Sequence, residues 1–325
     1  MTEALAPVIQ SLELQAGVCA QMGSPFSASV ARAVAADIAA GGAFAELAAP
    51  WAGKDVRRMF ADATPLRFLG GLHFLVLNGD APELAEVYPP AGGDVDPSRL
   101  AALVSATGRR HRDFFSGFLT SPPQTNEVNR SVCLSAGFMV VAKRSGLPLR
   151  CLEIGASAGL NLNWDRYHYD VGEAGVWGDP ASPVRLAAEW TGEPPSLDVL
   201  VRVVDRRGCD QNPIDVSDHA QAQRLKAYVW PDQLERMQRL AGAIEMAQRH
   251  RPPVDKADAA DWARSHGHGA PGTATVLYHS IVWSYLPDET QAGVRAAIES
   301  AGESASADAP FAWLRMEPNP NDLAA

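Results

Sequence analysis

The sequence has few cysteines, and their spacing does not build a site. Cys19, Cys133, Cys151 and Cys209 are scattered without a C-x-x-C pair, so we expect neither a disulfide framework nor a zinc knuckle. Buried free thiols in a reducing cytoplasm are the expected state. The segment His266-Gly267-His268 has no cysteine nearby and lies among glycines, which favours a solvated loop. We therefore predict no metal site.

The chain also lacks an excess of positive charge and a long apolar run. Its 28 Lys and Arg stand against 38 Asp and Glu, a formal net charge of −10, whereas phosphate binding needs a concentrated excess of cations. We expect no nucleic-acid partner. No apolar run approaches the ~20 residues of a membrane span, and the start of the chain lacks the basic and apolar regions of a signal peptide. The expected setting is the cytoplasm, without a membrane partner.

The first part of the chain has the pattern of a helical domain. With 325 residues, of which 46% are hydrophobic, the chain is long enough for one large or two ordinary domains. Apolar residues recur at helical spacing between Pro and Gly breakers, and no alternating strand pattern is visible before Leu149. The expected helices cover 25–49, 65–78, 97–118 and 124–145. We predict a helical N-terminal domain over residues 1–147.

From Leu149 onward, short apolar runs alternate with helical stretches, which is typical of an α/β domain with a parallel sheet. Residues 148–325 should form this second domain. The expected strands cover 149–154, 199–204, 253–254, 275–278 and 311–315. The expected helices cover 217–249, with a break at Trp230-Pro231, and 288–300. An insertion at about 167–195 is rich in Gly and Pro, and a hairpin is expected there.

The most informative stretch is the predicted strand at 149–154 and the small residues that follow it. Glu153 is followed by Gly155-Ala156-Ser157-Ala158-Gly159, and small residues are needed where a backbone turns sharply beside a ligand. Three interpretations fit: a cradle for a nucleotide-type cofactor, a tight turn without a ligand, or a G-x-S-x-G nucleophile elbow with Ser157 as nucleophile. A carboxylate two positions before the first glycine favours the cradle, because the strand before an elbow is typically apolar.

Two related motifs fit less well. A hydrolase triad of Ser157, Asp258 or Asp261, and His279 has the right chain order, which alone is weak evidence. The dinucleotide fingerprint G-x-G-x-x-G fails at two positions, where Ser157 and Leu160 stand.

Taken strand by strand, residues 148–325 resemble the class I S-adenosylmethionine-dependent methyltransferases. Glu153, Gly155, Ala156, Ser157 and Gly159 correspond to the first strand and its glycine-rich loop. Asp210, before Asn212-Pro213, corresponds to the acidic end of the second strand that binds ribose, with Asp205 as its rival. Asp258 corresponds to the loop that contacts adenine, and His279 to the position nearest the methyl group.

The order of these motifs also resembles a bacterial family of unknown function placed among the methyltransferase-like Rossmann folds. Trp177-Gly178-Asp179 and the segment at 124–130 belong to this resemblance. Within that segment, Asn126, Glu127 and Arg130 either project over the cofactor pocket or form a helix start, with Ser121 or Thr125 as cap and Glu127 favouring the helix dipole.

The resemblance implies a Rossmann-like, mostly parallel doubly wound sheet and S-adenosylmethionine as cofactor. The implied activity is methyl transfer to an unidentified small-molecule or protein acceptor. Glu153 would hold the methionine amino group, and His279 would be either a general base or a packed residue at a strand end. Two features depart from the pattern: Ser157 replaces the central glycine, and little sequence follows the fifth strand. Either the sequence is truncated or the sheet lacks its final antiparallel hairpin and has an exposed edge.

Two other functions stay open. The same fold can serve as a non-catalytic ligand-binding or interaction module, or Ser157 can serve a serine hydrolase.

Overall fold

The computed structural model describes residues 3–92, 95–188 and 190–318. The chain forms two compact units, one made of residues 1–125 and 219–238 and the other of residues 126–218 and 239–325. The expected boundary lay at residue 147. The difference arises because one helix before this point packs on the sheet and one helix after it packs on the helical unit.

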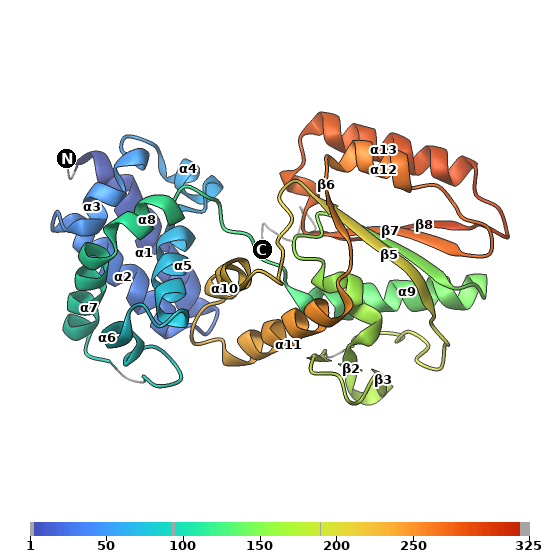
Figure 1. The fold of residues 1–325 in the computed structure, drawn as a ribbon, viewed down its shortest axis with the longest axis horizontal. Coiled ribbons are helices and arrows are strands. Elements are labelled where there is room, and N and C mark those ends of the chain that lie inside the picture. The colour runs from blue at the N-terminus through green and yellow to red at the C-terminus, as the bar shows by residue number, and fades with distance from the viewer. Residues whose placement is uncertain (1–2, 93–94, 189, 319–325) are drawn as a thin grey trace. The chain divides into compact units, whose positions relative to one another are not determined.

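The first unit is helical, as expected (Figure 1). Its helices are α1 (Ala6–Gln21), α2 (Pro25–Ala39), α3 (Ala43–Leu47), α4 (Val56–Ala61), α5 (Thr64–Leu77), α6 (Pro82–Ala85), α7 (Pro97–Arg110), α8 (Arg112–Phe118) and α10 (His219–Ala227), with the 3₁₀ turns η1 (Glu3–Leu5) and η2 (Ala49–Trp51). Phe44 lies at its centre and meets Phe68 and Phe115 edge to face, at ring-centroid distances of 5.8 and 5.2 Å. Such aromatic pairs add stability beyond the area they bury.

The long helical stretch expected at 217–249 is broken where Trp230-Pro231 predicts a break. Its first part, α10, belongs to the helical unit, where Arg224 donates a hydrogen bond to the Phe118 carbonyl at 3.1 Å. The Arg224 guanidinium also lies 4.0 Å from the centroid of the Phe118 ring. The second part, α11 (Leu234–His250), runs into the other unit from Arg239 onward.

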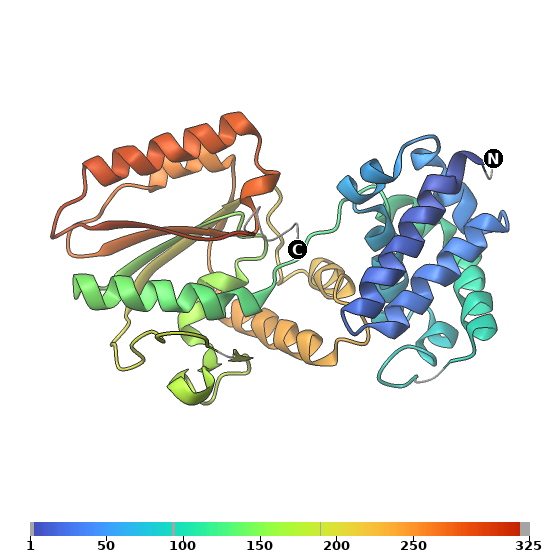
Figure 2. The same cartoon turned by 180° about the vertical axis from the view of Figure 1, so that it is seen from behind.

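The second unit is an α/β structure around a five-stranded parallel sheet in the order β6-β5-β1-β7-β8. The strands are β1 (Leu149–Ile154), β5 (Val203–Asp210), β6 (Val254–Lys256), β7 (Ala274–Ser280) and β8 (Phe311–Met316). Helices α9 (Ser131–Ser145) and α11 cover one face, and α12 (Ala259–His266) and α13 (Asp288–Glu303) cover the other (Figures 1 and 2). The predicted α/β class with a parallel sheet is confirmed.

Each face of the sheet has its own apolar core. On one face, Phe138 of α9 stacks on Trp164 with ring centroids 4.2 Å apart, and Tyr278 meets Phe138 edge to face. On the other face, Trp262 of α12 and Val294 of α13 pack against Leu152 and Leu277. The apolar runs of β1 and β7 therefore form central strands that are buried from both sides, as is typical of parallel sheets.

The predicted bounds of the second strand, 199–204, were wrong. Strand β5 begins at Val203 and continues to Asp210 through charged residues, whose side chains find partners on neighbouring segments. Arg206 forms an ion pair with Asp165 and Arg207 with Asp255, both with a shortest N–O distance of 2.6 Å. The paired residues lie far apart in sequence, so the local pattern of charged residues does not indicate a strand.

The insertion contains a small three-stranded sheet. Strands β2 (His168–Asp170) and β3 (Val176–Gly178) pair antiparallel, which confirms the expected hairpin, and β4 (Arg185–Ala187) pairs with β2 in parallel. Trp177 stacks on Trp164 with ring centroids 5.7 Å apart, and this contact attaches the hairpin to the core of the larger sheet.

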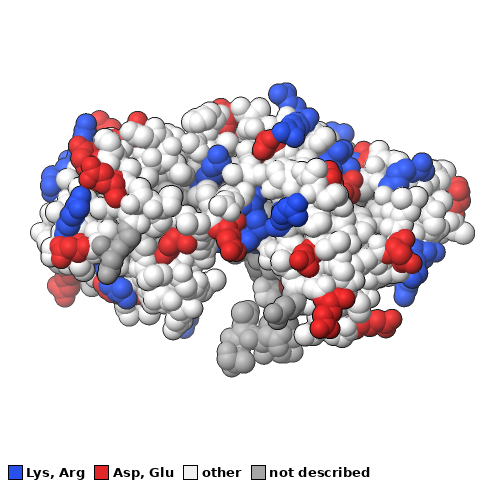
Figure 3. Space-filling model, turned by 90° about the horizontal axis from the view of Figure 1, so that it is seen from below, with Lys and Arg blue, Asp and Glu red and all other residues white. Residues whose placement is uncertain are grey.

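Among the described residues, β8 is the edge strand beyond β7, and no antiparallel strand pairs with it. In the same part of the chain, no helix is both long and apolar enough to cross a membrane. On the face drawn in Figure 3, acidic and basic side chains lie interspersed.

Candidate functional site

The candidate site lies at the carboxyl ends of β1 and β7, where the strand order reverses. In open α/β sheets, ligands bind at this point, outside the carboxyl ends of the strands. The loop after β1 turns sharply at Gly155, whose φ is +68°. A Cβ at Gly155 would lie 2.5 Å from Cγ2 of Val282, in the segment after β7. Glycine is therefore required there by both conformation and space.

Ser157 takes the central position of this loop with a φ of +54°, an uncommon conformation for a residue other than glycine. Its amide donates a hydrogen bond to Oδ2 of Asp210 at 2.9 Å, and Oδ1 of Asp210 accepts one from the amide of Asn212 at 2.8 Å. Asp210 thus joins the end of β5 to the loop after β1. The Ser157 hydroxyl is buried, and no hydrogen-bond partner for it is found among the described residues.

Glu153, near the end of β1, is a buried acid with 1% of its surface exposed. Burial raises the pKa of its carboxyl group to about 8, although the Tyr278 hydroxyl, which donates to Oε2 at 3.2 Å, and the charge of Arg130 oppose this rise. Arg130 itself donates to the Ser280 carbonyl at 2.9 Å, at the end of β7. The end of β1 therefore carries a carboxyl group that is largely protonated at neutral pH and lies in the field of a guanidinium.

The segment before α9 is bonded to the loop after β1. Oδ1 of Asn126 accepts a hydrogen bond from the amide of Leu160 at 2.9 Å, and the Asn161 side chain donates to the Glu127 carbonyl at 3.3 Å. The Glu127 side chain caps the 3₁₀ turn η3 (Val128–Arg130), and α9 begins at Ser131. The prediction that a helix begins near residue 124 was wrong, because the Asn126 side chain bonds to the loop after β1 and the turn η3 precedes the helix.

His279 lies on the opposite face of β7 from Tyr278, since successive side chains of a strand alternate. Its Nδ1 atom lies 2.6 Å from Oε1 of Glu317, which also accepts hydrogen bonds from the amides of Val282 and Trp283. Burial would raise the pKa of Glu317, but these three bonds outweigh it and the pKa is lowered. The His279 side chain is fully buried, and its Nε2 atom has no partner among the described residues.

Glu317 did not emerge from the sequence. It follows β8 directly, and the carboxyl ends of neighbouring parallel strands meet at one edge of a sheet. Applied to the predicted strands at 275–278 and 311–315, this rule would have placed Glu317 near His279.

Asp258 occupies the N-cap of α12. Its Oδ1 accepts hydrogen bonds from the amides of Ala260 and Asp261, and its Oδ2 accepts one from the Thr290 hydroxyl of α13 at 3.2 Å. This side chain therefore fixes the start of α12 and its contact with α13.

The candidate residues fall into separate groups. Glu153, Arg130 and Tyr278 lie together, and Asn126 and Asp210 both hold the loop that contains Ser157. Across the part of the chain described by the structure, no hydrogen bond joins Ser157 to His279, whose imidazole is bonded to Glu317. The same residues contain no cluster of three or more potential metal ligands among His, Cys, Asp and Glu.

A family model described as "Uncharacterized protein conserved in bacteria (DUF2332)" matches residues 10–324. The chain belongs to this family. The predicted membership of a bacterial family of unknown function is thereby confirmed. Comparisons with curated proteins and with solved structures gave no match. The DUF2332 match spans both units, so it includes every candidate residue named above.

Proposed function

We propose that the chain binds S-adenosylmethionine at the carboxyl ends of β1, β5 and β7 and transfers its methyl group to a small-molecule or protein acceptor. The observation that carries this proposal is the placement of Glu153, the Gly155–Gly159 loop and Asp210 at the point where the order of a five-stranded parallel sheet reverses. A parallel sheet of this strand order supports the proposal, because ligands of open α/β sheets bind at the carboxyl ends of the strands where the order reverses.

The methionine moiety of the cofactor carries an ammonium and a carboxylate group, and the site offers a carboxyl group for the first and a guanidinium for the second. Glu153 would bind the ammonium group, which favours the ionised carboxylate and lowers its raised pKa. Arg130, whose charge acts on Glu153, would bind the carboxylate. The buried Ser157 hydroxyl has no partner within the described residues, so a ligand at the loop would satisfy it.

The remaining candidate residues would hold the other parts of the cofactor. Asp210 would accept hydrogen bonds from the ribose hydroxyls, since each carboxylate oxygen has two acceptor sites and can keep its bond to the loop. Asn126 and Glu127 would line the pocket from the segment before α9. Asp258 would act indirectly, by fixing the start of α12, because both of its oxygens already accept bonds from α12 and α13.

In the proposed reaction, the acceptor nucleophile forms a bond to the methyl carbon while the bond from this carbon to the sulfonium sulfur breaks. The protein contributes alignment and the exclusion of water. With a proton on Nδ1, His279 donates a hydrogen bond to the Glu317 carboxylate, and Nε2 then carries the lone pair. His279 is the proposed general base, and it can take the proton of the acceptor only where its buried Nε2 atom becomes accessible to the acceptor.

Hydrogen–deuterium exchange of the full chain, with and without S-adenosylhomocysteine, tests the location of the site. Bound ligand should slow the exchange of amides in residues 153–160 and 208–213. The variant Asp210→Ala should weaken the effect without unfolding the unit, whereas Glu299→Gln, on the exposed surface of α13, should behave like the wild type. Protection confined to other segments would remove the assignment.

A non-catalytic ligand-binding module is the second candidate. The full burial of His279 favours it, because a base that the acceptor does not reach transfers no proton. The chain would then bind S-adenosylhomocysteine but give no methyl transfer with any acceptor tested. A serine hydrolase is a weaker alternative because Ser157 has no histidine partner among the described residues, and labelling of Ser157 by a fluorophosphonate would be needed to support it.

A further inference from the structure

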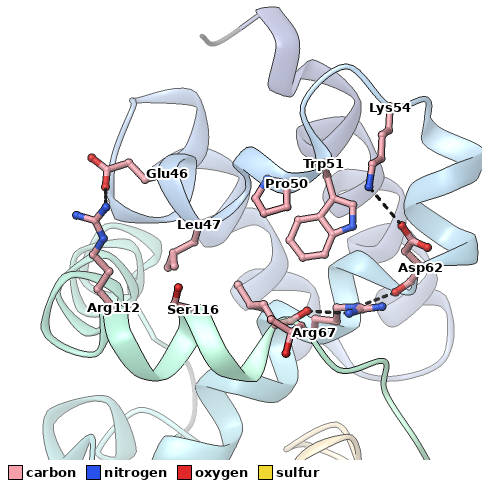
Figure 4. A pocket seen from close by; sticks show the side chains of 11 residues that line it. Glu46, Leu47, Pro50, Trp51, Lys54, Asp62, Arg67, Arg112 and Ser116 are labelled. Carbon is pink, nitrogen blue, oxygen red and sulfur yellow. Dashed lines mark hydrogen bonds and ion pairs between the residues drawn. The ribbon is translucent and has the colours of Figure 1, made fainter.

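The helical unit contains a cavity of about 360 Å³ that the proposed function does not use (Figure 4). This size lies within the range of about 300–1,000 Å³ that is usual for small-ligand sites. Its walls come from α3, η2, the region of α4 and α5, and α8. The lining includes Trp51 and Arg67 and the apolar side chains of Leu47, Pro50 and Leu119.

Arg67 is the unusual member of this lining. It is only 8% exposed, and its guanidinium donates to two backbone carbonyls, from Nε to Asp62 and from Nη1 to Leu119, both at 2.7 Å. The Asp62 carboxylate instead lies 3.1 Å from Arg58 and 4.0 Å from Lys54. Within the described residues, Arg67 therefore has no carboxylate partner at ion-pair distance. Buried charges are normally paired, so this guanidinium favours an anion in the cavity.

The other walls favour an aromatic group next to that anion. The Trp51 indole lies beside Arg67, with the guanidinium carbon 5.7 Å from the ring centroid, and both side chains face the cavity in Figure 4. Leu47, Pro50 and Leu119 add apolar surface. The other two cations of the lining, Lys54 and Arg112, already have acidic partners in Asp62 and Glu46. The lining thus combines a buried guanidinium that has no carboxylate at ion-pair distance within the described residues with an aromatic wall.

We propose that this cavity binds a small aromatic carboxylate. The carboxylate would accept hydrogen bonds from Nη2 of Arg67, the guanidinium nitrogen that does not take part in the bonds to Asp62 and Leu119, and the ring would pack on Trp51. Charge-assisted hydrogen bonds and aromatic contacts of this kind give both affinity and orientation. The site uses no residue of the α/β unit, so it stands or falls independently of cofactor binding.

Calorimetric titration of the full chain with phenylacetate tests the proposal, with phenylacetamide as an uncharged compound of the same shape. We expect saturable binding of phenylacetate at one site and at least tenfold weaker binding of phenylacetamide. Arg67→Met should lower the affinity for phenylacetate at least tenfold. Arg110→Gln is the matched control, because Arg110 forms an exposed ion pair with Glu83 outside the cavity, and it should leave the affinity unchanged.

A second variant keeps the test decisive if Arg67→Met fails to fold. Ser116 lies on α8 with its side chain directed into the cavity, so Ser116→Phe fills the space without removing the bonds of Arg67 (Figure 4). Binding should be lost while the melting temperature is kept. Equal affinity for the acid and the amide, unchanged binding in Ser116→Phe, or no heat from phenylacetate at about 10 mM, where a site of roughly 1 mM affinity is nearly full, would each overturn the proposal.

Discussion

The Nδ1 atom of His279 lies 2.6 Å from Oε1 of Glu317, and this bond joins the ends of two neighbouring parallel strands, β7 and β8. The same carboxylate oxygen accepts hydrogen bonds from the amides of Val282 and Trp283 in the segment after β7. Glu317 therefore fixes both the tautomer of the proposed base and the backbone beside it. Such partners commonly set the orientation of a functional imidazole.

We predict that Glu317→Gln destabilises the chain at neutral pH by about 1–2 kcal/mol, because hydrogen bonds to a charged group are replaced by weaker ones. The pKa of Glu317 is lower in the folded state than its ordinary value of 4.5, so its contribution is present above that value and is lost as the pH falls through the folded-state pKa. Urea denaturation at about pH 7 and at lower pH should show the difference shrinking in acid. A difference independent of pH would contradict this role.

Glu153 should have the opposite dependence on pH. Its pKa is about 8 in the folded state against an ordinary 4.5, so the folded state holds this proton more tightly. The free energy of unfolding therefore falls as the pH rises from 4.5 to 8, by about 1.4 kcal/mol for each pKa unit at most. Glu153→Gln should remove this part of the pH dependence and be more stable than the wild type near pH 8. Denaturation curves that stay parallel across this range would show that Glu153 titrates normally.

If Glu153 binds the ammonium group of the ligand, binding should release a proton near neutral pH. The ammonium lowers the pKa of the carboxyl group from about 8, and the affinity for S-adenosylhomocysteine should rise between about pH 6 and about pH 8. Calorimetry in phosphate and in Tris measures the released proton, because these buffers differ in their heats of ionisation. Glu153→Gln should bind more weakly and with the same heat in both buffers. Equal heats of binding for the wild type in the two buffers would show that Glu153 does not bind the ammonium group of the ligand.

Arg206 should be the critical cation of strand β5. It forms a two-bond ion pair with Asp165, with side chains 13% and 18% exposed, so Arg206→Met leaves a mostly buried carboxylate without its partner. We expect a loss of about 2–4 kcal/mol in the free energy of unfolding. Asp205→Ala, which removes the half-exposed partner of Arg150, should cost less than about 1 kcal/mol. Equal losses in urea denaturation of the two variants would contradict the register of β5.

The strands that follow from local apolar patterns were predictable. Strand β1 has the predicted bounds. A short, mostly apolar run between Pro148 and Gly155 is buried from both sides when it forms a central strand of the sheet. Strand β5 was misplaced because the side chains of Arg206 and Arg207 are paired across the fold, and no local pattern carries that information. The start of α9 was missed for a related reason, since Asn126 bonds to Leu160, 34 residues away in sequence.

The candidate site follows the same division. Glu153 and the Gly155–Gly159 loop could be predicted as site residues, because they are adjacent in sequence and form a recognisable motif. Glu317 and Arg67 could not be predicted in this way. Glu317 gains its role from its bond to His279, and Arg67 from its burial without a carboxylate partner among the described residues, and both features arise only in the folded chain. Tertiary contacts between polar side chains are thus the information that single-sequence patterns leave out.

The proposed function depends on the binding of S-adenosylmethionine by the loop after β1. Calorimetric titration of the wild-type chain with S-adenosylhomocysteine measures this binding without any knowledge of the acceptor. We expect saturable binding at one site with an affinity in the micromolar range, about −8 kcal/mol. A flat titration of well-folded protein would show that the loop does not bind this cofactor.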